Sequence, residues 1–328
     1  MNIHRSTHKY KIHPESLFIN QTNILSSETL HLIKSSNIEL FIDVYEENPN
    51  DKTETIVFIH GNSYSKIIFQ NQINAFSQRY RVVAIDLLGH GNSTKLNELN
   101  LSAETADILA LDLYNPLAMV AVLVQFLESN QLKKTHLAGF GLGGHLAYGI
   151  AVENPELVSS ISAIGSPPIL FSHDGLKKGF DEWFVNNLIP EWINSPKIYN
   201  ESEDALITNR IGFTPEDFNL HQLMTEADPL VRKHLFFKNK NYDDQAFLNS
   251  CLDGEHFVLN TDIPLHLVVG ENDVVVNQQY YHHFENKLLN KKSRINIIEN
   301  EPHMILSACP EKFTALYDNF LQDICQNA

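Results

Sequence analysis

The sequence predicts an α/β protein with a mostly parallel sheet that has helices on both faces. Apolar runs of strand length alternate with longer segments of helical periodicity, which is typical of strands joined by crossover helices. This alternation stops after Ser166-Pro167-Pro168, and the segment 169–259 is aromatic-rich and helical in pattern without a clear buried strand. We therefore expect an N-terminal extension at 1–25, a sheet core at 26–168 and 260–328, and a helical cap inserted at 169–259.

The expected strands are short apolar runs bounded by turn residues. The earliest, Asn37–Tyr45, is predicted to be of the antiparallel type. The buried strands are predicted at Glu54–His60, Arg81–Leu87, Thr135–Phe140, Val158–Ile164, Leu265–Gly270 and Arg294–Glu299.

Five segments have the spacing of helices, and two of them begin at a proline, which is favoured in the first turn. They are Ile68–Gln78, Pro116–Ser129, Gly143–Glu153, Gln278–Leu289 and Pro310–Gln322.

The composition excludes several classes of protein. Asp and Glu outnumber Lys and Arg by 40 to 24, which gives a formal charge of -16 and argues against nucleic acid as a partner. The three cysteines, Cys251, Cys309 and Cys325, have neither an even number nor CxxC spacing, so neither a disulfide framework nor a zinc site is expected. The composition predicts neither a cofactor nor a metal, and leaves the oligomeric state open.

No targeting or membrane segment is expected. Residues 1–23 carry His, Lys, Ser and Asn rather than a basic tip followed by an apolar run, so they do not predict a signal peptide. No run reaches 18 uninterrupted apolar residues, so no membrane span is predicted. Together with the cysteine content, this favours a cytoplasmic protein.

Three motifs each follow a predicted strand, and together they carry a family resemblance. They are His60-Gly61-Asn62-Ser63, Asp86-Leu87-Leu88-Gly89-His90-Gly91-Asn92-Ser93 and Gly139-Phe140-Gly141-Leu142-Gly143-Gly144-His145. Their order, followed by an acidic loop and a histidine loop, resembles the α/β-hydrolase family from about residue 35 to 322. In that family the third motif is the nucleophile elbow, G-x-S-x-G. Here its central residue is Gly141.

The resemblance implies that the other members of a catalytic triad are present. Gly270-Glu271-Asn272-Asp273 resembles the acid loop, and Glu301-Pro302-His303 resembles the histidine loop. Asp273 would then accept a hydrogen bond from His303 and fix its tautomer. The backbone N–H groups of Asn62 and Leu142 would form the oxyanion hole.

Glycine at position 141 keeps the turn but removes the nucleophile. The elbow conformation costs a non-glycine residue on the order of 1–3 kcal/mol, and glycine tolerates it better. Ser63, Ser166 and Cys309 lie near the motifs, but none occupies an elbow. A water in the space of the missing hydroxymethyl group, deprotonated by His303, is the better substitute. The same pair could instead take a proton from the substrate.

Several residues have other interpretations. Gly139-x-Gly141-x-x-Gly144 also matches a dinucleotide-binding fingerprint, but the next strand ends in Ser166 without the acidic residue that such a site needs. His60, His90 and His145 are expected to be structural. The aromatic residues of the expected cap, which could line a pocket or pack in a core, are Trp183, Phe184, Trp192, Phe236 and Phe237.

The sequence therefore predicts an α/β-hydrolase-family enzyme that acts on a small ester-, amide- or related acyl-type molecule without a serine nucleophile. The alternative is an inactive pseudoenzyme that binds a small molecule or a protein partner in the same cleft. A dinucleotide-binding protein is the remote alternative. Fold alone does not decide between them.

Overall fold

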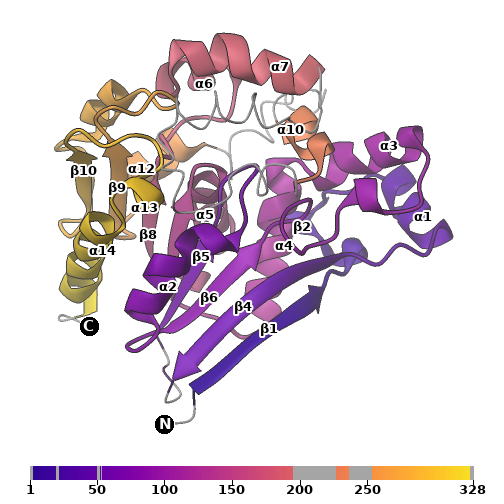
Figure 1. The fold of residues 1–328 in the computed structure, drawn as a ribbon, viewed down its shortest axis with the longest axis horizontal. Helices are drawn as coiled ribbons and strands as arrows, with labels where there is room; N and C mark the ends of the chain where they lie inside the picture. The colour runs from indigo at the N-terminus through magenta and orange to yellow at the C-terminus, as the bar shows by residue number, and fades with distance from the viewer. Residues whose placement is uncertain are drawn as a thin grey trace.

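The computed structural model describes residues 3–19, 22–49, 52, 54–194, 227–235 and 253–325. Its centre is an eight-stranded sheet with the strand order β1-β4-β6-β5-β7-β8-β9-β10 (Figure 1). The pairs β1–β4 and β4–β6 are antiparallel, and the other neighbours are parallel. The strands are β1 (Ile3–Lys11), β4 (Phe41–Pro49), β5 (Thr55–Ile59), β6 (Arg81–Asp86), β7 (Thr135–Phe140), β8 (Val158–Ile164), β9 (Leu265–Gly270) and β10 (Arg294–Ile298), beside a small hairpin of β2 (Phe18–Ile19) and β3 (Thr22–Asn23).

Helices cover both faces of the sheet. In Figure 1, α2 lies in front of the sheet near α14, and α4 and α5 lie behind it. A hydrogen bond from Gln72 to Thr314 joins α2 to α14. The helices of this layered part are α1 (Ser27–Ser35), α2 (Gln70–Phe76), α3 (Ala103–Leu113), α4 (Pro116–Ser129), α5 (Leu142–Glu153), α12 (Gly254–Asn260), α13 (Ile305–Ala308) and α14 (Pro310–Cys325).

The central strands and α4 are buried almost along their whole length, which explains their continuous apolar sequences. Every residue of β5, β7 and β9 is buried. Helix α4 begins at Pro116 after an Asn115 N-cap, whose side chain accepts a hydrogen bond from the Ala118 N–H group. The core therefore lies between the sheet and the helices on each face.

Further helices lie between β8 and β9 in the chain. In Figure 1, α6 (His173–Gly179), α7 (Ile189–Asn194) and α10 (Pro229–Leu235) stand above the carboxyl ends of the parallel strands. A π-helical turn, Phe184–Leu188, leads into α7. These helices form the roof over the ends of β5, β7 and β8.

Most predicted elements are confirmed, and some boundaries differ. β7, β8, β9 and α4 have the predicted bounds. The early strand begins at Phe41 rather than Asn37, because Asn37 adopts a φ of 51° in the turn that ends α1. The predicted helix at Gln278–Leu289 is instead a 3₁₀-helix over Gln278–Phe284, and Asn286 has a φ of 62° shortly after it.

The N-terminal segment departs most from expectation. Part of the segment 1–25, which the sequence places outside the core, forms β1, the edge strand of the sheet. β1 pairs with β4 from Ile3↔Pro49 to Lys11↔Phe41. An ion pair of 3.1 Å between Arg5 and Glu47 joins the two strands. This polar segment has no apolar pattern that would predict a strand. It forms one because it pairs with β4.

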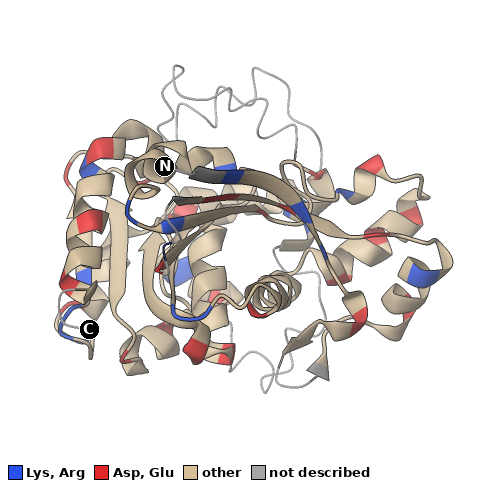
Figure 2. Ribbon diagram, turned by 90° about the horizontal axis from the view of Figure 1, so that it is seen from below, with Lys and Arg blue, Asp and Glu red and all other residues tan. Residues whose placement is uncertain are grey.

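Two further properties of the molecule are the distribution of its charged residues and the length of its apolar helices. Figure 2 shows acidic residues distributed over the outer helices, with basic residues interspersed among them. Among the described residues, no single helix is long and apolar enough to cross a membrane. Taken together, α3 and α4 have the length and the composition of a membrane span, but the pair is bent by 67°.

Candidate functional site

Gly141 forms the turn between β7 and α5. Its φ of 52° and ψ of -116° lie in a region that side chains disfavour. Its N–H donates to the Ile164 carbonyl at 2.9 Å, and its own carbonyl accepts from the Ser166 hydroxyl at 2.7 Å. These bonds hold the strand-to-helix turn against the end of β8.

Gly141 is the glycine of this motif that has room for a side chain. A Cβ atom on Gly139 would overlap α5, one on Gly143 would overlap the end of β5, and one on Gly144 would overlap the Ser166 side chain after β8, so these three allow helix and sheet to pack closely. A Cβ on Gly141 would have the Gly61 Cα, at 3.7 Å, as its nearest neighbour. A serine therefore fits the space at position 141 but not the preferred backbone conformation.

Asp273 and His303 form a buried hydrogen-bonded pair. The His303 Nδ1 lies 2.7 Å from Asp273 Oδ2, and the two side chains are 7% and 0% exposed. Asp273 Oδ1 also accepts hydrogen bonds from the N–H groups of Val275 and Val276, each at 2.8 Å. With Nδ1 donating to Asp273, Nε2 is the nitrogen of His303 that remains as an acceptor.

His303 lies over the turn after β8 and beside the end of β7. Its ring centroid is 5.0 Å from that of Phe140, and a Cβ on Gly165 would meet its ring at 2.9 Å. Gly165 has a φ of 56°, and glycine there allows the histidine ring to approach the backbone closely. The imidazole is therefore held near the elbow turn by packing as well as by Asp273.

Asn62, in the loop after β5, and Leu142, at the start of α5, line the same cavity as Gly141. Leu142 is the first residue of α5, so its N–H has no partner within the helix. The two polar atoms of the Asn62 carboxamide are buried, and neither has a hydrogen-bond partner among the described residues. The site thus presents polar groups that the protein itself leaves unused.

Two buried histidines support the loop that carries Asn62. His60 contacts its neighbour's carbonyl through Nδ1 and accepts from the Leu87 N–H at 3.0 Å. His90 Nε2 accepts from the Ser63 N–H at 3.1 Å. Burial lowers the pKa of each ring to about 3, which keeps both neutral at physiological pH. This is the structural role that the sequence predicts for them.

The roof also contacts this loop. Arg232 of α10 is 1% exposed, and its guanidinium donates to the Ser63 hydroxyl at 3.1 Å. Asp228, which precedes α10, accepts from the Tyr114 hydroxyl at 2.8 Å and from the Asn97 N–H at 3.0 Å. The sequence alone does not indicate Arg232 or Asp228 as residues of the site, because their positions depend on tertiary contacts.

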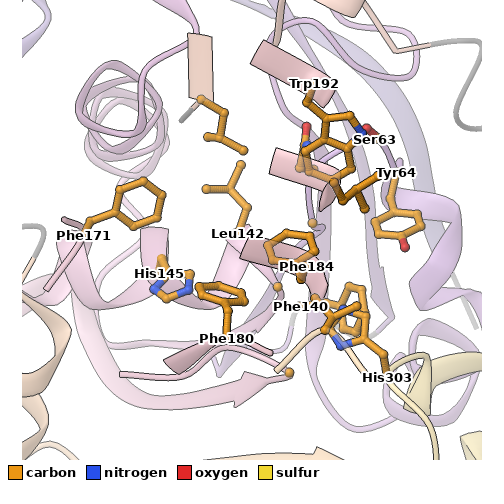
Figure 3. Close-up of a pocket in the computed structure, with 17 residues that line it drawn as sticks. Ser63, Tyr64, Phe140, Leu142, His145, Phe171, Phe180, Phe184, Trp192 and His303 are labelled. Carbon is orange, nitrogen blue, oxygen red and sulfur yellow. The ribbon is translucent and has the colours of Figure 1, made fainter. Parts of the chain in front are cut away.

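An apolar cavity of about 80 Å³ lies above Gly141, enough for several water molecules. Figure 3 shows His303 and Phe140 at one side of it and His145 with Phe171 at the other. Its lining residues are Gly61, Asn62, Ser63, Tyr64, Phe140, Gly141, Leu142, His145, Gly165, Phe171, Phe180, Phe184, Leu188, Trp192, Leu235, Val275 and His303.

The neighbouring hydroxyl and thiol groups are engaged elsewhere. Ser166 donates to the carbonyls of Gly141 and Ile164. Ser63 accepts from Arg232. Burial raises the pKa of the Cys309 thiol to about 12, so it is protonated and a weak nucleophile.

A group that could hold a metal ion lies at the other end of the sheet. The ligand atoms of Glu54, His136 and Cys325 lie within 4.8 Å of one another, near the starts of β5 and β7. Burial raises the pKa of Cys325, which disfavours the thiolate that a metal would need. This group is remote from the cavity.

The structure brings the predicted site residues Gly141, Asp273, His303, Asn62 and Leu142 to one region, and all but Asp273 line the cavity. Among the aromatic residues of the expected cap, Phe184 and Trp192 line it, whereas Phe236 and Phe237 lie outside the described residues. His145, for which the sequence predicts a structural role, also lines the cavity, and its Nε2 has no partner among the described residues.

The curated relatives of this chain include proteins whose names indicate that they act on acyl compounds. A pimeloyl-[acyl-carrier protein] methyl ester esterase from Neisseria meningitidis is 21% identical over 280 residues, covering 84% of this chain and 78% of the relative. Monoacylglycerol lipase from Bos taurus is 22% identical over 281 residues, covering 82% and 76%. A probable lysophospholipase from Arabidopsis thaliana is 28% identical over 177 residues, 52% of this chain and 34% of the relative. The chain matches a third to a half of the length of such plant relatives.

Comparison with solved structures supports the same fold. A serine-to-glycine variant of an N-acyl homoserine lactonase, complexed with N-hexanoyl homoserine lactone, superposes with a TM-score of 0.70 at 20% identity, covering 88% of this chain and 96% of that one. A bromoperoxidase from Bacillus anthracis gives 0.67 at 17% identity, covering 88% and 97%. A sequence model of the alpha/beta hydrolase fold matches residues 54–307, and the chain therefore belongs to the α/β-hydrolase fold family.

Proposed function

We propose that this protein hydrolyses a small ester-, amide- or related acyl-type molecule without a covalent intermediate, using a water activated by His303. The observation that carries the proposal is the Asp273–His303 hydrogen bond at a cavity where Gly141 leaves open space. The apolar lining suits the acyl part of such a molecule. The names of the esterase and lipase relatives support the same class of substrate.

His303 is the proposed general base. Asp273 holds Nδ1 as the donor, which leaves Nε2 to take a proton from water and supports the imidazolium that forms. The water would occupy the space that a hydroxymethyl group on Gly141 would fill. The Asn62 carboxamide, which has no hydrogen-bond partner among the described residues, offers that water both a donor and an acceptor.

The proposed reaction is a direct addition of water. The water oxygen bonds to the acyl carbon while its proton passes to Nε2 of His303. The N–H groups of Asn62 and Leu142 stabilise the negative oxygen of the tetrahedral intermediate. The bond to the leaving oxygen or nitrogen then breaks, and that atom takes the proton from His303. The products are a carboxylic acid and an alcohol or amine.

The expected rate is low. Loss of a triad nucleophile costs about 10⁶ in turnover and leaves about 10³–10⁴ over the uncatalysed reaction. A slow but specific rate is therefore the signature of this mechanism.

Hydrolysis of p-nitrophenyl acetate by variants of the pair tests this function. We expect His303→Ala and Asp273→Asn each to reduce the protein-dependent rate at least about tenfold, because each removes the base or its correct tautomer. His31→Ala, which changes an exposed histidine of α1, is the matched control and should leave the rate unchanged. Equal rates in all four proteins would contradict the proposal.

Ligand binding without turnover is the second candidate function, and the absence of a side chain at Gly141 favours it. In that case acyl esters should raise the melting temperature of the wild type and of His303→Ala, while hydrolysis stays at the buffer rate in both. Thermal unfolding with and without ester, beside the rate measurement, separates the two functions.

A further inference from the structure

His145 is a buried polar side chain in the wall of the apolar cavity. It lies on the second turn of α5 and is 6% exposed. Its ring contacts those of Phe171 and Phe180, with centroids at 5.6 and 6.0 Å (Figure 3). The Tyr148 ring lies against it as well, with a centroid distance of 6.2 Å. Its Nε2 is fully buried and has no hydrogen-bond partner among the described residues.

This environment gives His145 a definite chemical state. Burial lowers its pKa to about 4, so the ring is neutral at physiological pH and carries one donor and one acceptor nitrogen. The other buried histidines near the site, His60 and His90, satisfy their nitrogens within the protein. A buried polar group without a partner costs free energy, which calls for an explanation by a ligand or by strain.

The position of His145 relative to the turn suggests what its partner is. Gly141 caps the N-terminus of α5 and His145 is the fourth residue of the helix, so both lie at the same end of α5, and both line the cavity. Helical side chains also lean towards the N-terminus, which brings the imidazole closer to Gly141. If the carbonyl of a bound molecule lies above Gly141, its acyl chain would reach His145 within a few bonds of that carbonyl.

We propose that His145 is a specificity-determining residue that hydrogen-bonds a hydroxyl or oxo group on the acyl chain of the ligand. The inference rests on the proposed function, because it takes the acyl chain to occupy this cavity. The surrounding phenylalanines would bind the carbon chain, and His145 would select chains that carry an oxygen at this depth. The ligand class is thereby narrowed from acyl esters in general to oxygenated acyl esters.

Three esters of one chain length test the inference by binding, which does not require turnover. The probes are methyl hexanoate, methyl 3-hydroxyhexanoate and methyl 3-oxohexanoate, measured by isothermal titration calorimetry with the full chain. We expect the wild type to bind at least one oxygenated ester about threefold to tenfold more tightly than methyl hexanoate, the effect of one hydrogen bond. In His145→Leu this preference should vanish, and in His145→Gln it should be partly kept.

Phe171→Leu is the matched control, because it changes the same wall of the cavity without removing a polar side chain. It should weaken all three esters by a similar factor. Stability supplies a second readout: His145→Leu should raise the urea midpoint of unfolding, since it removes an unpaired buried polar group. A histidine with a purely structural hydrogen bond would give a lower midpoint.

The outcomes separate this inference from the proposed function. If all three esters bind equally to the wild type, or if the preference survives in His145→Leu, the inference is overturned and the proposed function stands. If none of the esters binds but p-nitrophenyl acetate is hydrolysed with dependence on His303, the inference is overturned and the proposed function stands. If neither binding nor His303-dependent hydrolysis is seen, the proposed function fails and the inference fails with it.

Discussion

At the scale of single residues, Gly141 combines open space with an unfavourable backbone conformation. The space above it is free, but its φ of 52° and ψ of -116° disfavour any side chain. The open space determines which groups can react, whereas the backbone conformation affects the free energy of unfolding. The two properties therefore change different measured quantities. They can therefore be separated by substitution at this one position.

We predict that Gly141→Ser creates a reactive serine at a cost in stability. The variant should form a stoichiometric fluorophosphonate adduct and hydrolyse p-nitrophenyl acetate faster by several powers of ten. Its free energy of unfolding should fall by about 1–3 kcal/mol, as measured by urea titration. Gly141→Ala is the matched control, with the same strain and no adduct. A folded Gly141→Ser that gains no reactivity would mean that position 141 is not the elbow.

At the scale of elements, α10 is attached to the core at several points. Asp228 is fully buried before its first turn, Arg232 reaches Ser63 from its middle, and Lys233 and His234 contact Asp107 of α3. These bonds tie the roof to the loop that carries Asn62. The geometry of that loop therefore depends partly on α10.

We predict that Tyr114→Phe loosens α10 specifically. The Tyr114 hydroxyl donates to Asp228 at 2.8 Å and accepts from the Leu96 N–H at 2.9 Å, so its loss removes the partner of the Leu96 N–H and one of the hydrogen bonds that hold the buried Asp228 carboxylate. Stability should fall by about 1–3 kcal/mol, and hydrogen exchange should accelerate in α10 more than in β5 or β7. Tyr10→Phe, which loses only a partly exposed hydroxyl, is the control and should cost less. Unchanged exchange in α10 would contradict this role.

At the scale of the whole molecule, several neutral histidines are buried in different places. Burial lowers the pKa to about 3 for His60, His90 and His266 and to about 4 for His145. In the unfolded chain these rings return to a pKa of about 6.5. Between these values the unfolded state binds more protons, so acid favours unfolding.

We predict that stability is greatest above pH 6.5 and is lost as the pH falls towards 4. Each of these histidines contributes up to about 1.4 kcal/mol per pH unit over this range, so the loss by pH 5.5 is on the order of several kcal/mol. Urea unfolding at a series of pH values measures it. His266→Gln, far from the cavity, should make the dependence less steep. A free energy of unfolding that is constant from pH 7.5 to 5.5 would contradict the prediction.

The sequence predicted the central sheet because its strands are buried on both faces and so have continuous apolar sequences. It also predicted that four site residues lie together, because each follows a strand and the carboxyl ends of parallel strands share one edge. These residues are Asp273, His303, Asn62 and Leu142. β1 was missed, since its polar residues become a strand only by pairing with β4. The exposure of His145 to the cavity was missed for a similar reason: helical periodicity shows that a face is buried, but not what covers it.

The edge strand β1 also bears on how copies of this protein meet one another. β4 is nine residues long, and without β1 the backbone N–H and C=O groups on the side of β4 that faces away from β6 would be exposed as a template for another chain. β1 covers that template and places Arg5, Lys9 and Lys11 on the new edge, where cations discourage further strand addition. Removing the first residues of the chain would therefore leave the cavity's own residues in place but open the sheet to polymerisation, and a tag or fusion at this end risks the same.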